Sequence, residues 1–414
     1  MSEQTGTGLA QPRHYAVLGG GGFLGRAIVR MLRARGDAVR VFGRHRYPEA
    51  EALGAECVVG DVRDPAAVMR ACQGCHTVFH TIAICDIIRD KRLYYEVNVR
   101  GSANVLRACL ENKVRCLVYT STPSVVIAPH HIILGDESLP YLDHYLAPYP
   151  KTKAIAEKMI LDADNWEMVP NSPADDRREL GEHNVTRLRT CAIRPHLIWG
   201  PDDPHILPQL FAFTLEKRLR IIGDGLNQVS ITYVDNAAHA HILAADELAG
   251  QARCAGKAYF VHDTEPVVLW DWINSLLASL HLPTVTRRVD YRSAYIVAAL
   301  CEWLTAGLPF LGPAKMTRFV TNELAFSHSF SHERASRDFG YQPIVSPQQA
   351  LDNVIAWANQ QKLSSRKKHE GYGQYGRYGQ YGLTILSILS IASIAFSIIA
   401  ADCVAFASCC RGAP

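Results

Sequence analysis

A run of glycines near the N-terminus constrains the fold of this chain more than any other feature. Residues Gly19–Gly25 read Gly-Gly-Gly-Gly-Phe-Leu-Gly, directly after the apolar run Tyr15–Leu18 and before a stretch with helical spacing of apolar residues. Residues without a Cβ let the backbone approach a pyrophosphate, and the following helix N-terminus offers free N–H groups and a positive dipole end. The segment therefore predicts a dinucleotide-binding turn, with a plain tight turn as the alternative. Its expected contact residues are Gly19, Gly22, Phe23, Leu24 and Gly25.

Short apolar runs alternate with amphipathic stretches from this turn as far as residue 126. Strand, helix, strand at this rhythm predicts right-handed βαβ units and a parallel sheet. We expect an α/β protein with a Rossmann-type, doubly wound parallel sheet over residues 14–199 and a smaller C-terminal substrate lobe over 200–361. Residues 165–187 are polar and are expected to form a surface loop. The apolar stretch 291–311 carries Glu302 and is expected to be a buried or surface-lying helix.

Composition excludes several classes of function. The chain has 43 basic and 40 acidic side chains and no basic stripe, so nucleic acid is not an expected partner. Its 12 cysteines are too scattered for a disulfide scaffold, and residues 1–14 have no apolar segment typical of a secretion signal. The histidines show no metal-ligand spacing with acidic residues, so no metal site is expected.

The end of the second predicted strand indicates which nucleotide fits. An acidic residue there would bind the adenosine ribose of NAD, but this chain has Gly43 followed by Arg44. A guanidinium pairs bidentately with a 2′-phosphate, so Arg44 predicts a preference for NADP(H), with NAD(H) as the alternative. A second alternative is that Arg44 and Arg46 are only solvated. Asp61 and Val62 follow the third strand, where they would contact the adenine, although Asp61 also suits a simple loop cap.

A tyrosine and a lysine four residues apart are the predicted catalytic pair. Tyr149 and Lys153 lie in a stretch expected to be helical over 149–164, where this spacing places both on one face. A nearby ammonium favours a phenolate, so we expect Lys153 to lower the pKa of Tyr149 and to hold the nicotinamide ribose. Tyr149 would then exchange a proton with a substrate oxygen during hydride transfer. A plain surface pair is the alternative.

Hydroxyl groups follow the strand that ends before residue 121. Such groups at the carboxyl end of a strand lie where ligands bind in open α/β sheets. Thr122 is the predicted hydrogen-bond donor to the substrate carbonyl, and Ser121 and Ser124 are the alternatives.

Taken together, these residues resemble the extended short-chain dehydrogenase/reductases, over roughly residues 15–357. Within them the chain looks most like the 3β-hydroxysteroid dehydrogenase branch, which includes sterol-4α-carboxylate 3-dehydrogenases. The stretches that carry this resemblance are Val118–Ser121, Pro148–Pro150, Ala192–His196, Trp199–Pro201 and Tyr233–Asn236. Other stretches are similar to bacterial reductases of 2-alkyl-3-oxoalkanoates, namely Thr122–Val125, Lys151–Glu157 and Asp338–Tyr341.

The resemblance implies roles for individual residues. The family's acid–base pair matches Tyr149 and Lys153, and its serine position matches Thr122, where the hydroxyl is kept. Pro195 begins the segment whose backbone would face the nicotinamide amide. Asn98 matches a structural position that ties neighbouring strands.

The expected function is an NAD(P)-dependent oxidoreductase that interconverts a secondary alcohol and a ketone on a large apolar substrate, foremost a 3β-hydroxysteroid or sterol. An NADPH-dependent reductase of a β-keto fatty acid derivative is the second hypothesis. A non-catalytic NADP(H)-binding sensor or scaffold is a hypothesis of a different class. A homodimer, common among such relatives, is also expected.

The C-terminal part changes composition. Residues 362–382 read as a flexible linker rich in glycine and tyrosine, and residues 383–401 contain no charge. As a helix this last stretch would cover about 28 Å, close to the thickness of a bilayer core. It predicts a membrane anchor, and the basic residues 366–368 before it favour a catalytic domain that faces the cytosol. The alternatives are a low-complexity tail without a role and a cytoplasmic protein.

Overall fold

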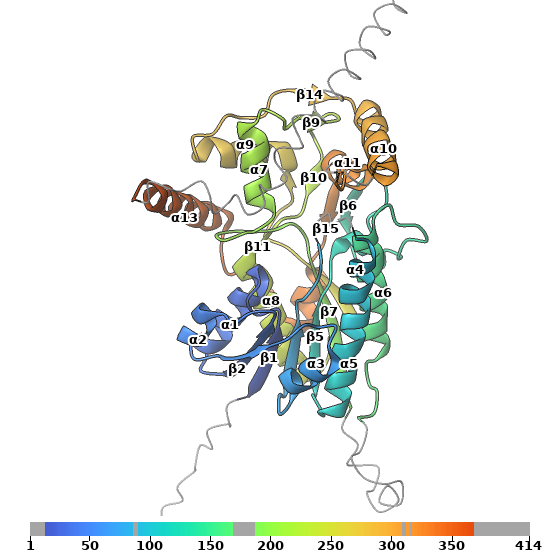
Figure 1. Cartoon of the computed structure of the whole chain (residues 1–414), viewed down its shortest axis with the longest axis vertical. Helices are drawn as coiled ribbons and strands as arrows, with labels where there is room; N and C mark the ends of the chain where they lie inside the picture. The colour runs from blue at the N-terminus through green and yellow to red at the C-terminus, as the bar shows by residue number, and fades with distance from the viewer. Residues whose placement is uncertain (1–12, 86–89, 169–186, 309–311, 315, 368–414) are drawn as a thin grey trace, which may run out of the picture.

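The computed structural model describes residues 13–85, 90–168, 187–308, 312–314 and 316–367. The lower part of the molecule in Figure 1 is built on a seven-stranded sheet in which every neighbouring pair is parallel. In spatial order its strands are β3 (Glu56–Val59), β2 (Ala38–Gly43), β1 (His14–Leu18), β4 (Thr77–His80), β5 (Cys116–Thr120), β7 (Arg189–Pro195) and β12 (Lys257–Val261). The strand order reverses between β1 and β4, which is where ligands bind in such sheets. The predicted Rossmann-type fold is confirmed.

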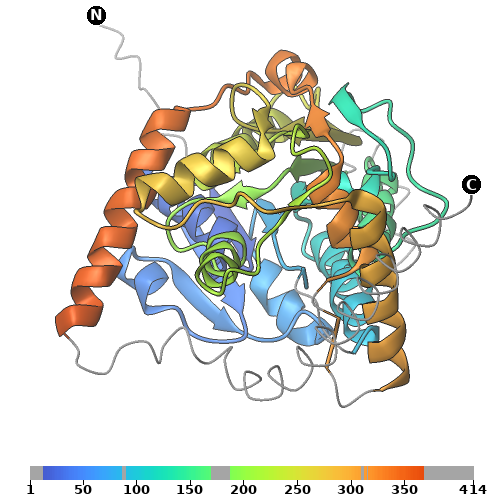
Figure 2. The ribbon, with the colours of Figure 1, turned by 90° about the horizontal axis from the view of Figure 1, so that it is seen from above.

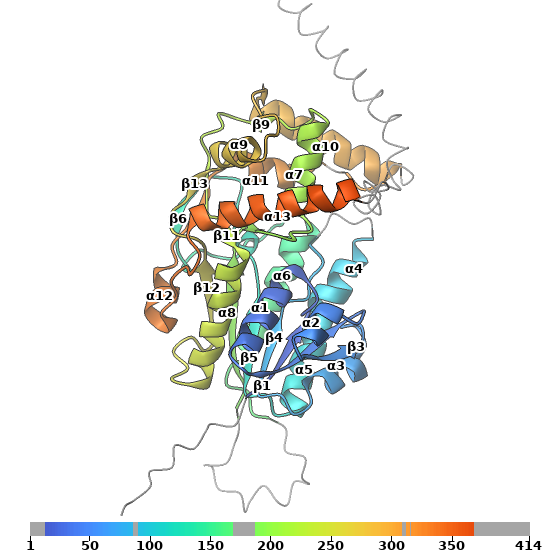
Figure 3. The same ribbon diagram turned by 90° about the vertical axis from the view of Figure 1, so that its left-hand side faces the viewer.

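Helices cover both faces of this sheet, as Figure 3 shows from the side. One face carries α1 (Phe23–Ala34) and α8 (Val234–Ala249), and the other carries α3 (Pro65–Cys72), α5 (Gly101–Glu111) and α6 (Pro148–Asp162). Strand side chains alternate between the two faces: Val17 packs in the core under α1 and α8, whereas Ala16 packs in the core under α3 and α5. Both faces are buried, which explains the nearly continuous apolar strands of the sequence.

A second lobe lies over the carboxyl ends of the sheet strands, in the upper part of Figure 1. It contains a four-stranded sheet of β13 (Val267–Val268), β10 (Gln228–Val229), β15 (His328–Phe330) and β6 (Ile132–Gly135). Two strand pairs join it, β8 (Ile198–Trp199) with β11 (Thr232–Tyr233) and β9 (Ile221–Ile222) with β14 (Arg288–Val289). Its helices are α7 (Ile206–Leu215), α9 (Leu269–Ser279), α10 (Tyr291–Gly307), α11 (Arg318–Ala325) and α13 (Pro347–Lys367). Helix α12 (Glu333–Phe339) lies lower, beside β12 and α8 (Figure 3). Seen from above in Figure 2, α10 and α13 lie at opposite sides of this lobe.

Elements from both sides of the expected domain boundary at residue 199 contribute to each part of the molecule. Strand β6 precedes this boundary but pairs with β15 of the upper lobe. Helix α8 and strand β12 follow it but belong to the lower sheet. The two parts of the molecule therefore share elements from both halves of the sequence, and the predicted domain division stays a prediction.

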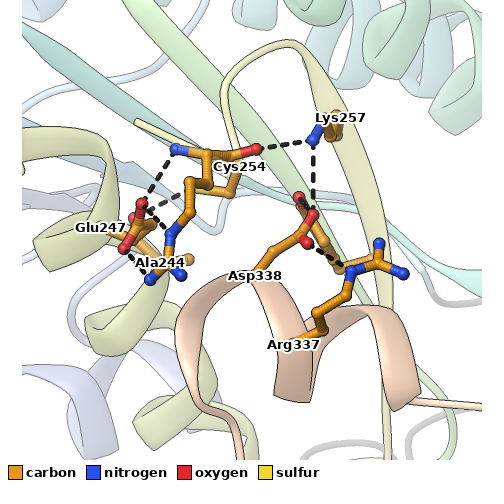
Figure 4. A network of polar contacts seen from close by, with 8 residues as sticks. Ala244, Glu247, Cys254, Lys257, Arg337 and Asp338 are labelled. Carbon is orange, nitrogen blue, oxygen red and sulfur yellow. Dashed lines mark hydrogen bonds and ion pairs between the residues drawn. The ribbon is translucent and has the colours of Figure 1, made fainter. Parts of the chain in front are cut away.

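One carboxylate fixes the edge strand β12 to helix α12 (Figure 4). Asp338 accepts hydrogen bonds from the Tyr259 hydroxyl at 2.7 Å and from Arg337 Nε at 3.0 Å, and Lys257 Nζ lies 3.4 Å from its Oδ2. At the same edge, Glu247 pairs with Arg253 at 2.9 Å across the turn between α8 and β12. These contacts hold α12 against β12, the last strand of the sheet, and the N–H of Phe260 in this strand donates to Glu137 at 2.9 Å.

Several sequence predictions fall on other parts of the chain. Most of the predicted loop 165–187, most of the linker 362–382 and all of the apolar stretch 383–401 lie outside the described residues. Within the described ranges, no helix is both long and apolar enough to cross a bilayer. Residues 291–307 of the apolar stretch form α10, which lies at the surface with Ile296 and Trp303 exposed by 65% and 72%.

Candidate active site

The glycine turn joins β1 to α1 at the point where the strand order reverses. Gly19 has a φ of +90°, which favours glycine, and its N–H donates to the Phe42 carbonyl at 2.8 Å. Gly22 donates to the Gly19 carbonyl at 2.8 Å and is the last residue before α1. A Cβ on Gly25 would overlap the Gly19 carbonyl, so only glycine lets α1 begin this close to the turn. The first N–H groups of α1, at Phe23 and Leu24, have no intrahelical acceptor and suit a pyrophosphate.

An aromatic ring that sequence reasoning missed lies against this turn. A Cβ on either Gly21 or Gly43 would overlap the ring of Tyr47. An acidic side chain at position 43 therefore conflicts with Tyr47 in this arrangement. The only sequence signal for this contact is an aromatic residue three positions after Arg44.

The charged groups predicted to select the nucleotide differ in their environments. Arg46 pairs with Glu51 at 2.6 Å and is the solvated surface charge that the alternative proposed. Arg44 is exposed and, among the described residues, forms no ion pair. Asp61 Oδ2 accepts a hydrogen bond from Arg63 Nη2 at 2.8 Å, and the pairing with this guanidinium lowers the pKa of Asp61 to about 2.

Asp61 also serves as a loop cap, because its carboxylate accepts the Arg63 N–H at 2.9 Å. Val62 is only 3% exposed, and its side chain packs against Gly101. Contact of Asp61 and Val62 with an adenine stays a prediction.

Tyr149 and Lys153 both lie on α6, beside the carboxyl end of β5. Lys153 Nζ donates to the Thr120 carbonyl at 2.5 Å and lies 4.0 Å from the centre of the Tyr119 ring. Lys153 is 2% exposed, and burial lowers its pKa to about 7, although Glu157 opposes this shift. The lysine is thus held by a carbonyl and an aromatic face rather than by solvent.

The pKa of Tyr149 corrects one sequence prediction. Burial raises this pKa above its ordinary value, the nearby Cys85 adds to the shift, and a hydrogen bond with Thr122 opposes it. The expected lowering by Lys153 is wrong for this arrangement, because the ammonium is directed at Thr120 and Tyr119. The structure brings the Thr122 and Tyr149 hydroxyls together, and the predicted hydrogen bond from Thr122 to a substrate carbonyl stays a prediction.

The alternative hydroxyls lie close by. Ser124 Oγ is 3.3 Å from Thr122 Oγ1, and its N–H donates to the same oxygen. Ser121 is buried, and its hydroxyl has no hydrogen-bond partner within the described part of the chain.

A buried histidine on α8 supports the carbonyl that Lys153 uses. His241 Nδ1 lies 2.7 Å from the Ala237 carbonyl, and its Nε2 lies 2.8 Å from Thr120 Oγ1. Burial lowers the pKa of His241 to about 4, so the ring is neutral at neutral pH. The Nδ1 proton then goes to Ala237, and Nε2 accepts the Thr120 hydroxyl. Sequence reasoning missed His241 because it lies 121 residues from Thr120.

A buried ion pair fixes α6 to β7. Arg194 donates to Glu157 through Nη2 at 2.5 Å and Nε at 3.0 Å, and the Tyr141 hydroxyl donates to Glu157 at 2.5 Å. Burial would raise the pKa of Glu157, but Arg194 holds that pKa below its usual range. Glu157 lies one turn after Lys153, and Arg194 directly precedes Pro195. The pair therefore sets the distance between the catalytic helix and the strand that would face the nicotinamide.

Asn98 has a structural role, though not between strands. It lies in a π-helical turn, Tyr95–Arg100, and its side chain binds the N–H and carbonyl of Ile84 at 2.8 and 3.1 Å. Its amide also donates to Thr152 Oγ1 at 3.1 Å. Asn98 thus ties the segment after β4 to α6, next to Lys153.

Known proteins similar to this chain share most of its length. Residues 16–288 match the model of the 3-beta hydroxysteroid dehydrogenase/isomerase family. A 2-alkyl-3-oxoalkanoate reductase of Stenotrophomonas maltophilia is 42% identical over 342 residues, which is 82% of this chain and 98% of that protein. The decarboxylating sterol-4-alpha-carboxylate 3-dehydrogenase of Mus musculus is 32% identical over 351 residues, 84% of this chain and 91% of that protein.

Solved structures support the fold. A short-chain dehydrogenase/reductase superfamily protein of Agrobacterium tumefaciens with bound NAD has a TM-score of 0.62 at 19% identity, covering 86% of this chain and 100% of that one. The UDP-glucose 4-epimerase of Thermus thermophilus in complex with NAD has a TM-score of 0.58 at 21% identity, covering 84% and 99%. The sequence matches show that this chain belongs to the 3-beta hydroxysteroid dehydrogenase/isomerase family and is an oxidoreductase of the dehydrogenase/reductase type.

Proposed function

We propose that this protein is an NADP(H)-dependent dehydrogenase/reductase acting on a large apolar β-hydroxy or β-oxo acid with a branch next to its carboxylate. The observation that carries the proposal is the meeting of Tyr149, Thr122 and Lys153 at the carboxyl end of β5. This edge of the sheet also bears the glycine turn, where a dinucleotide would lie.

The names of the relatives support this substrate class. A 2-alkyl-3-oxoalkanoate and a sterol 4-carboxylate with oxygen at C3 both carry a carboxylate on the carbon next to the reacting one. In both, that carbon also bears an alkyl branch. The identity of 42% to the oxoalkanoate reductase, against 32% to the sterol enzyme, favours an acyl chain over the sterol that the sequence analysis put first.

The residues of the site divide the work of carbonyl reduction. A bound nicotinamide would supply or accept the hydride. Tyr149 gives its proton to the substrate oxygen in reduction and takes it back in oxidation. Its raised pKa keeps the phenol protonated, which suits the reducing direction. Thr122 hydrogen-bonds the same oxygen. Lys153, on α6 beside the end of β5, would hold the nicotinamide ribose.

Replacing Tyr149 tests the catalytic assignment. Tyr149→Phe is expected to lower turnover of a 2-alkyl-3-oxoalkanoate by about 100-fold or more, because the proton donor is lost. NADPH binding, followed by fluorescence titration, should stay nearly unchanged. Tyr95→Phe, at an exposed position, is the matched control. Full activity of Tyr149→Phe would contradict the assignment, and NADPH binding by wild-type protein without turnover of any 3-oxo acid or sterol would favour the sensor hypothesis.

The buried Lys153 predicts a pH dependence of stability. Its pKa is about 7 when folded, against about 10.4 for an unfolded lysine. At pH values between these two pKa values, the unfolded chain binds one more proton than the folded chain. The free energy of unfolding therefore rises with pH by at most about 1.4 kcal/mol per pH unit. Below pH 7 both states are protonated and this contribution to the slope vanishes.

Lys153→Met should remove this part of the slope. Urea denaturation at pH 7 and pH 9 measures it, as the difference between wild type and variant. Lys151→Met, two residues earlier at an exposed position, should keep the wild-type slope. Equal slopes for Lys153→Met and wild type would show that Lys153 is charged throughout this pH range.

Arg44 carries the proposed preference for NADP(H). It is exposed and free of ion pairs among the described residues, so it is available for a 2′-phosphate. Arg44→Ala is expected to raise the Kd for NADPH by about 10- to 100-fold, the strength of charge-assisted hydrogen bonds, and to leave the Kd for NADH nearly unchanged. Arg46→Ala is the control, because Glu51 already engages Arg46. A parallel loss for both cofactors would refute the selectivity argument.

We also propose that the apolar stretch 383–401 anchors the protein to a membrane with its catalytic part in the cytosol. The exposed apolar side chains of α10, Ile296, Leu300 and Trp303, favour a nearby lipid surface. A chain ending after Lys367 keeps every described helix and should move from the membrane to the soluble fraction of lysed cells while retaining activity. An unchanged membrane fraction would refute the anchor. The expected homodimer stays a prediction.

A further inference from the structure

Three metal-binding types of side chain meet beside the catalytic site. His196 follows β7, Glu323 lies on α11 and His328 begins β15, three elements that lie one above another at the junction of the lobes (Figure 1). Glu323 Oε2 lies 3.8 Å from His196 Nε2 and 3.7 Å from His328 Nδ1. One ligand atom from each residue lies within 4.8 Å of the others. The side chains of His196 and His328 are 4% and 0% exposed, and that of Glu323 is 18% exposed.

Several polar atoms of these three residues lack hydrogen-bond partners. Within the described part of the chain, His196 Nε2, Glu323 Oε1 and both ring nitrogens of His328 accept or donate no hydrogen bond. Buried polar atoms in this state each cost about 1–3 kcal/mol, so several at one point indicate a missing partner. The N···O separations of 3.7 and 3.8 Å are too long for the three residues to satisfy one another.

The tautomer of His196 suits a ligand. Its Nδ1 lies 2.7 Å from the Ser230 carbonyl, which can only accept a hydrogen bond. Nδ1 therefore carries the hydrogen, and Nε2 keeps a lone pair. That lone pair points to the side of the ring where Glu323 lies. Metal-binding imidazoles in proteins are usually oriented by a hydrogen bond from the other ring nitrogen to an acceptor such as a backbone carbonyl.

We propose that His196, Glu323 and His328 form a binding site for a divalent transition-metal ion, with Zn²⁺ as the best fit. Two imidazoles and one carboxylate are a ligand set of zinc sites that keep a fourth position open. Ligand atoms bound tetrahedrally at about 2.0–2.1 Å lie about 3.4 Å apart. The two N···O separations of 3.7 and 3.8 Å therefore need to shrink by only a few tenths of an ångström, and the two imidazole nitrogens, which lie within 4.8 Å of each other, would move together around the ion. One cation would satisfy His196 Nε2, His328 Nδ1 and the Glu323 carboxylate together.

The site lies close to the reaction. Glu323 is near enough to Tyr149 for its charge to act on the phenol, and His196 directly follows Pro195. Three protein ligands leave one position for water or for an anionic group. The spacing of histidines and acidic residues along the chain predicts no metal site, because His196 and Glu323 are far apart in sequence and only the fold brings them within 3.8 Å of each other.

Zinc binding by the purified full-length chain tests this inference. After EDTA treatment and dialysis, isothermal titration with ZnSO₄ should show one ion per chain with micromolar or tighter affinity, and the ion should raise the Tm. Glu323→Gln keeps the size of the side chain, and His328→Ala removes one ligand. Each should weaken binding by about 100-fold or more and abolish the rise in Tm.

Other variants and ions separate the outcomes. His239→Gln, a histidine on α8 outside the cluster, should bind zinc like the wild type. Co²⁺ bound in the same place should give the visible absorption of a four-coordinate ion, which Glu323→Gln lacks. Absence of stoichiometric binding to wild type would overturn the site, as would binding that Glu323→Gln and His328→Ala leave intact, since cysteines would then be the ligands. These readouts do not depend on turnover, so they stand apart from the test of Tyr149.

Discussion

The buried ion pair between Glu157 and Arg194 is the interaction on which the arrangement of the site depends. It joins α6, which carries Tyr149 and Lys153, to β7, which leads to Pro195. Removing one partner of such a pair leaves an uncompensated buried charge and costs about 3–5 kcal/mol. The Tyr141 hydroxyl satisfies the carboxylate further, so the pair specifies one position of the catalytic helix on the sheet.

The candidate site residues lie at one edge of the sheet because the carboxyl ends of all its parallel strands lie there. The glycine turn follows β1, the hydroxyls follow β5, and Pro195 ends β7. The upper lobe closes over this edge and adds Glu323 and His328. The lower sheet thus supplies the glycine turn and the hydroxyl groups, and the upper lobe supplies two of the three proposed metal ligands.

Local patterns predicted the parts of the structure that depend on local spacing. The glycine turn, the alternation of strands and helices, and the helix with Tyr149 and Lys153 could all be read from residues within a few turns of one another. The pKa of Tyr149 could not, because it depends on burial by distant segments. His241 and the cluster of His196, Glu323 and His328 were missed for the same reason. Pairing across residue 199, of β6 with β15 and of β12 with β7, likewise joins segments that are distant in the sequence.

The link between Asp338 and β12 makes the position of the last sheet strand depend on a segment near the end of the described chain. A strand at the end of a sheet offers unpaired N–H and C=O groups to any other strand. Here that strand is held under α12 by a carboxylate located almost eighty residues later. Loss of the segment from residue 333 onward would remove this contact and the Phe339 ring that packs on Tyr259, so the edge strand would lose its attachment to α12 while the Phe260 N–H kept its partner, Glu137.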